Sequence, residues 1–215
     1  IPEIKKSIGL SDGQFGLVIL GSTLGSIAGA QIAGRAMHTF GSRPVLNLSS
    51  LIMPAGLIAM GIANTGVELF FSLALMGFGY AMTDMTLHYQ GVVVERILEK
   101  KWMLSFHGMW SVGAFLITVF GGAISAHLPP RENLYITAIF GAIAFIPVNL
   151  FLLAPSIDDH SGDGVNDTEG KVALFGRSVL PLWLIGIGLV ASLIAEGSAG
   201  DWGGVLLNSN MNIDG

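Results

Sequence analysis

The chain has 215 residues, of which 52% are hydrophobic and 12% charged, with 30 glycines, no cysteine and a formal net charge of −5. Soluble domains carry about 25% charged residues and about 7% glycine, so this composition excludes an ordinary water-soluble domain and indicates several membrane-spanning helices. The lack of a basic excess disfavours nucleic acid as a partner, and the lack of cysteine excludes disulfides, thiolate metal sites and cysteine nucleophiles.

Six apolar stretches bounded by charges approach the ~20 residues that a helix needs to cross a hydrocarbon core of about 30 Å. The sequence therefore predicts an all-α fold, a multi-span membrane helix bundle. The expected spans are residues 15–34, 45–63, 69–94, 103–127, 134–154 and 178–200.

A polar segment rich in Asp, Gly and Ser, residues 155–177, divides five of these spans from the sixth. We interpret 1–154 as most of one half of a bundle, 155–177 as a linker, and 178–215 as the first span of a second half with the loop after it. Because the chain opens with Ile1 and ends on Gly215 without a natural stop, we expect it to be a fragment.

The distribution of lysine and arginine predicts the orientation of the spans. Seven of the ten basic residues follow the first, third and fifth spans: Arg35, Arg43, Arg96, Lys100, Lys101, Lys171 and Arg177. The opposite side holds Lys5, Lys6 and Arg131. Since basic loops stay in the cytoplasm, we expect a multi-pass protein of the cell (inner) membrane with a cytoplasmic linker and both chain ends outside.

The first span carries small residues at a spacing of four, namely Gly21, Gly25, Gly29 and Ala33. This spacing aligns them on one helix face and permits the close approach of a neighbouring helix. We interpret the stripe as a packing seam without a role in transport.

Ionisable residues in the third span form a second stripe. Asp84, His88, Gly91 and Glu95 are spaced i, i+4, i+7 and i+11, which places them on one helix face, with Asp84 near the middle of the membrane. A carboxylate at that depth costs at least about 2.5 kcal/mol in lipid, so we expect Asp84 to face a wet cavity and to exchange protons. His88 either tunes that exchange or pairs with polar neighbours, and Glu95 with Arg96 forms either a gate contact or a solvated helix end.

Two other spans carry candidate site residues. In the fourth span, His107 and Trp110 lie near the inner end, where a histidine can carry protons at ordinary pH. In the sixth span, Glu196 and Asp201 stand in a glycine-dense segment, where we expect the helix to loosen. Asp201 with Trp202 has the alternative role of marking the membrane interface.

No metal site and no cofactor are expected. The acidic segment at 159–170 imitates part of a calcium-binding loop, but its twelfth position is Gly170 rather than glutamate. Asp84 and His88 lack the third ligand of a metal cluster, and no serine stands in a nucleophile motif, so an enzyme is not expected.

Four segments resemble a known family. Residues 34–43 (GRAMHTFGSR), with Gly34, Arg35, Gly41 and Arg43, resemble the cytoplasmic signature loop of the major facilitator superfamily of transporters. That loop usually has an acid and a base where His38 and Thr39 stand, and a basic residue at Ser42. The other three segments resemble the fucose-permease-like branch: DMTLHYQGVVVE from Asp84, SFHGMWSVG from Ser105 and AEGSAGDW from Ala195.

The resemblance implies a major facilitator fold of twelve helices in two six-helix halves, of which about six spans, the second to the seventh, are present. It implies secondary active transport of a small polar, sugar-like solute, coupled to protons by alternating access, with membrane lipid around the bundle. A non-transporting membrane sensor or an intramembrane enzyme is the alternative. The first helix and most of the second half are then missing from this chain.

Overall fold

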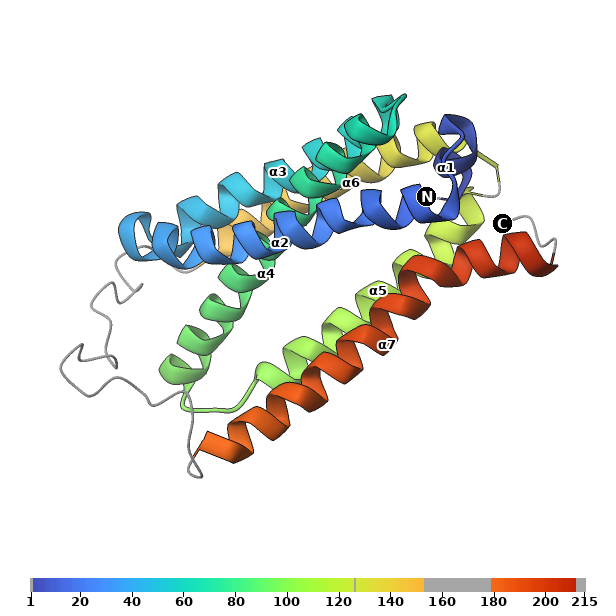
Figure 1. Cartoon of the computed structure of the whole chain (residues 1–215). Helices are drawn as coiled ribbons and strands as arrows, with labels where there is room; N and C mark the ends of the chain where they lie inside the picture. Colours follow the sequence, from blue (N-terminus) through green and yellow to red (C-terminus); the bar gives the residue numbers. More distant parts are fainter. Residues whose placement is uncertain (1, 126, 153–178, 212–215) are drawn as a thin grey trace. The chain divides into compact units, whose positions relative to one another are not determined.

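The computed structural model describes residues 2–125, 127–152 and 179–211, and within these ranges the chain is helical without strands. It divides into two units, residues 3–160 and 161–215, so the last helix is described by itself. The helices are α1 (Pro2–Ile8), α2 (Asp12–Phe40), α3 (Ser42–Ile62), α4 (Gly66–Leu98), α5 (Met103–Ser125), α6 (Pro130–Phe151) and α7 (Leu180–Met211) (Figure 1).

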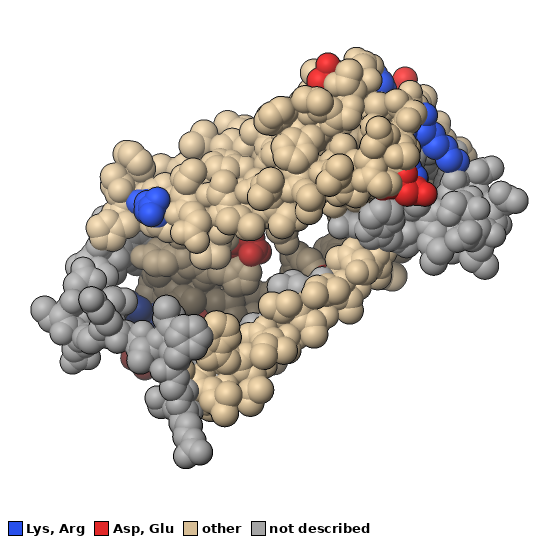
Figure 2. Space-filling view, viewed as in Figure 1, with Lys and Arg blue, Asp and Glu red and all other residues tan. Residues whose placement is uncertain are grey.

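Five helices, α2 to α6, are long and apolar enough to cross a membrane. The expected all-α, multi-span bundle is confirmed. On the face shown in Figure 2, blue and red atoms gather mostly toward the helix ends, whereas most of the length between them is tan. The α1 helix was not expected, because its seven residues are too few to show an apolar period.

Two expectations about local structure are wrong. Residues 34–40 were expected in a loop, but they continue α2, and Gly41 alone separates α2 from α3. The glycine-dense segment at 196–204 was expected to loosen, but α7 is continuous there. Unpaired backbone groups cost several kcal/mol each in an apolar medium, which outweighs the helix penalty of ~1 kcal/mol per glycine.

The α2 and α4 helices pack backbone against backbone, so the predicted packing seam is confirmed. Gly21, Gly25 and Gly29 are buried on α2, and a Cβ atom on any of them would overlap a carbonyl oxygen of α4. These oxygens belong to Phe70, Ala74 and Phe78. The contact is reciprocal, since Gly77 of α4 approaches the carbonyl of Ser22 equally closely.

The α3 helix packs on another side of α4 in the same manner. A Cβ atom on Gly56 would lie 2.6 Å from the Cα of Met76, and one on Gly79 would lie 2.5 Å from the backbone nitrogen of Met53. Both distances are too short for real atoms, so these positions require glycine. The α4 helix is therefore held between α2 and α3 by glycines on all three helices.

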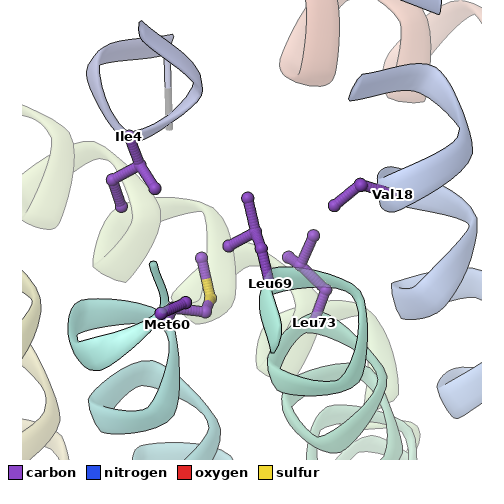
Figure 3. Close-up of a cluster of buried hydrophobic side chains, with 6 residues drawn as sticks. Ile4, Val18, Met60, Leu69 and Leu73 are labelled. Atoms are coloured by element: carbon purple, nitrogen blue, oxygen red, sulfur yellow. The ribbon is translucent and has the colours of Figure 1, made fainter. Parts of the chain in front are cut away.

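An apolar cluster joins four helices at the end of the bundle near the chain start (Figure 3). Its buried members are Ile4, Val18, Met60, Ala63, Leu69 and Leu73. Ile4 anchors α1 in the cluster, and Lys5 forms an ion pair with Asp12 at the start of α2. The α6 helix joins this end as well, because Nη2 of its Arg131 donates to the carbonyl oxygen of Ala63, 3.1 Å away. These contacts hold five helices, α1 to α4 and α6, together at this end of the unit.

The α5 helix has no buried side chain among its described residues, and large apolar side chains such as Leu104 and Phe115 are exposed within this unit. Only its first turns meet α4, where the side chains of Met103 and Phe106 lie against Gly91.

The seam between α2 and α4 predicts the outcome of a matched pair of substitutions. We expect Gly25→Ala to destabilise the full-length protein by about 1–3 kcal/mol, because its Cβ atom collides with the backbone of α4. Gly34→Ala places the same group at an exposed position of α2 with open space around it. Thermal unfolding of both variants in detergent measures the difference. Equal melting temperatures would contradict the packing.

Candidate functional site

The site is built on one face of α4, where Asp84 and His88 form a pair. The Oδ1 atom of Asp84 lies 3.5 Å from Nδ1 of His88, and the same nitrogen lies 2.8 Å from the carbonyl oxygen of Asp84. Their side chains are 47% and 55% exposed within this unit. His88 thus bonds the backbone of Asp84 and lies within ion-pair distance of its carboxylate, and neither α2 nor α3 encloses the pair.

A different face of α4 carries polar residues that are paired with α3. Thr83 Oγ1 donates to Ser49 Oγ, 3.0 Å away, and Gln90 Nε2 donates to Ser42 Oγ. All four side chains are buried. Sequence analysis missed this set, although Thr83, Thr86 and Gln90 stand at the spacing i, i+3, i+7 that marks a helix face.

The signature segment, residues 34–43, turns at Gly41. Its φ of 82° and ψ of 163° lie in a region that glycine readily adopts, and its N–H donates to the carbonyl oxygen of Met37. Gly34 and Arg35 are exposed on α2, whereas Arg43 is half-buried in the first turn of α3. Ser42 is buried and accepts the hydrogen bond from Gln90, so the turn is tied to α4 of the same unit.

Glu95 connects α4 to α5. Its Oε1 atom accepts the backbone N–H of Met103, 2.6 Å away, at the first residue of α5. A carboxylate there satisfies an N–H that has no partner inside its own helix, and it faces the positive end of the helix dipole. Arg96 is exposed in the last turn of α4, where both residues border a hollow of about 390 Å³. A gate role for the two residues stays a prediction.

On α5, the rings of His107 and Trp110 are stacked, with centroids 5.5 Å apart and an interplanar angle of 17°. Both are exposed within this unit. Among the described residues, no hydrogen bond or ion pair joins them to Asp84 or His88.

The two candidate acids of the sixth expected span lie on α7, in the second unit. Glu196 is exposed there, while Asp201 is part of the helix but its side chain is outside the described residues. Asp84 lies in the first unit, so the two acids and Asp84 belong to separate units. Within the described part of the chain, no three acidic or histidine side chains approach closely enough to hold a metal ion.

The bond between Glu95 and Met103 predicts different effects for two substitutions. Glu95→Ala removes the acceptor, so we expect about 0.5–2 kcal/mol of lost stability at the start of α5. Glu95→Gln keeps an amide oxygen that can accept the same N–H. Hydrogen exchange of the Met103 to Phe106 amides should be about tenfold faster in the alanine variant than in the glutamine variant. Unchanged exchange in Glu95→Ala would contradict the capping role.

The chain is similar to several membrane proteins. An uncharacterized MFS-type transporter of Yersinia pestis is 28% identical in an alignment that covers 97% of this chain and 52% of that protein. An uncharacterized transporter of Sinorhizobium fredii is 29% identical over 97% of this chain and 53% of its own length. The membrane protein MosC of Rhizobium meliloti is 24% identical over 94% of this chain and 47% of its own length.

The chain thus spans about half the length of the curated relatives it matches. No solved structure matches it. The sequence model of the Major Facilitator Superfamily matches residues 1–212, nearly the whole chain. On this match, with the helical bundle described above, the chain belongs to the Major Facilitator Superfamily.

Proposed function

We propose that the full-length protein is a secondary active transporter of the inner membrane, which moves a small polar, sugar-like solute together with protons by alternating access. The observation that carries the proposal is the Asp84–His88 pair on the face of α4 that α2 and α3 leave open. In a membrane protein, an ionisable pair of this kind marks a pathway for a solute or a proton, because lipid does not tolerate it.

The arrangement of the rest of the protein is part of the same proposal. We place the chain in the fucose-permease-like branch, with 1–154 in the first half of the transporter and 178–215 at the start of the second half. The linker 155–177, all of which is outside the described residues, is cytoplasmic, and both chain ends are outside. The exposed apolar side chains of α5 need cover, which lipid or other helices of the full-length protein supply.

Asp84 couples the proton to the solute in this mechanism. When its carboxylate is ionised, closing the cavity around it strips water from a charge and is costly. Protonation removes that cost, so the occluded state becomes accessible once proton and solute are both bound. The ring of His88 lies 3.5 Å from that carboxylate, so it is the side chain placed to act together with Asp84.

The remaining candidates take supporting roles. His107 and Trp110 present a stacked pair of rings, of which either can pack on the apolar face of a sugar-like solute. Glu196 and Asp201 supply polar contacts from the second half. Glu95 and Arg96 lie at the inner boundary, where a change in the junction of α4 and α5 can gate the cavity.

Uptake into proteoliposomes of the full-length protein tests the proposal. An imposed pH gradient, with a panel of sugars and polyols, identifies a solute that accumulates. Asp84→Asn should then lose gradient-driven accumulation by about two orders of magnitude or more, yet retain solute exchange, because an amide cannot carry the proton. Glu95→Gln is the matched control, since it removes a carboxylate from the same helix and keeps its acceptor oxygen.

Normal accumulation by Asp84→Asn, with an unchanged dependence on pH, would show that Asp84 is structural. Product formation without accumulation would favour the membrane enzyme. Binding of a solute without any flux would favour the sensor.

A further inference from the structure

A second surface of this unit has no role in the proposed transport. An apolar groove of about 330 Å³ lies between α2 and α3 with α4 at its floor. Its lining residues are Ile32, Ala36, Phe40, Pro44, Val45, Leu48, Ile52, Phe78 and Met82. Val45 and Met82 are 4% and 3% exposed, whereas Phe40 and Leu48 are 67% and 56% exposed. The groove therefore has a buried floor, apolar walls and an open side.

The groove lies on the opposite side of α4 from the candidate transport site. At about 100° per residue, Asp84 is displaced by about 200° from Met82 around the axis of α4. A solute bound at Asp84 cannot reach the groove across the helix. The groove thus opens on a different side of α4 from the candidate transport site.

Two basic residues belong to the stretches of α2 and α3 that line the groove. Arg35 and Arg43 directly precede the lining residues Ala36 and Pro44. They are the only charged residues between positions 13 and 67, and among the described residues neither guanidinium has a carboxylate partner. The signature segment has His38 and Thr39 where the family usually has an acid and a base. The described residues therefore supply two guanidinium groups near the groove and no carboxylate paired with either of them.

The depth of the groove fits one leaflet. From Arg43 to Ile52, α3 rises about 13 Å at about 1.5 Å per residue, against about 15 Å for half of a hydrocarbon core. Arg43 in the first turn of α3 then lies at the level of the headgroups. The long side chain of Arg35 can extend toward the same level along the apolar surface.

We propose that this groove binds one anionic phospholipid of the cytoplasmic leaflet, with an acyl chain along α2 and α3 and the phosphate on Arg43 and Arg35. Guanidinium groups bind phosphate through paired hydrogen bonds. No acidic residue stands in the first turn of α3 to compete. The site rests on the proposed orientation but not on transport, so its test is independent of solute accumulation.

Native mass spectrometry of the full-length protein tests the site, in micelles with equal amounts of phosphatidylglycerol and phosphatidylcholine. We expect one tightly retained phosphatidylglycerol molecule. Arg35→Gln with Arg43→Gln should reduce the preference for phosphatidylglycerol by about fivefold for each arginine removed. Lys100→Gln with Lys101→Gln is the matched control, because it removes the same charge from the connection between α4 and α5 and should leave the preference unchanged.

A variant inside the groove tests the binding of the acyl chain separately from the binding of the headgroup. Ala36→Phe fills the furrow and should reduce retention of both lipids, while thermal unfolding confirms that the variant is folded. An unchanged preference in the double arginine variant would overturn the proposal, as would an equal loss in the lysine control. A dimer whose formation Ala36→Phe abolishes would assign the groove to a second copy instead.

Discussion

The structure of the first unit depends on direct contact between helix backbones. Gly25 and Gly29 of α2, with Gly56 of α3, bring their helices so close to α4 that even one methyl group would collide. Lipid tails are as apolar as leucine, so helices in a bilayer gain little from burying apolar surface against one another. They associate through close packing, and glycine allows the closest. Because α4 is held on two sides in this way, its position and rotation are fixed.

That fixed rotation decides what each face of α4 can do. The face toward α3 carries Thr83 and Gln90, whose polar groups are buried and paired. The face between α2 and α3 carries Phe78 and Met82, which form the floor of the apolar groove. The face with Asp84 and His88 remains open. A rotation of the helix would place an ionisable pair against lipid or backbone. By preventing that rotation, the glycine contacts keep Asp84 and His88 on the open face.

Sequence periodicity predicted those features that lie on one helix. The seam of Gly21, Gly25 and Gly29 and the stripe of Asp84 and His88 both follow from spacing. Contacts between helices could not be predicted from spacing, because the need for glycine at Gly56 depends on Met76 of another helix. The hydrogen bond between Glu95 and Met103 depends on where α4 ends and α5 begins; the expected spans gave the start of α5 at 103 but ended the third span at 94, four residues before Leu98. The role of Glu196 depends on the second half of the protein.

The most direct measurement is the aqueous reactivity of single cysteines along α4 in the full-length protein, with its other cysteines removed. The described chain contributes none of its own. Cysteines at Asp84 and His88 should react with a small hydrophilic thiol reagent about an order of magnitude faster than cysteines at Thr83 and Thr86, because reaction requires the water-exposed thiolate. A transported solute should slow the reaction at the first two positions only. Faster reaction at Thr83 and Thr86, or equal rates at all four, would contradict an open, water-filled face at Asp84.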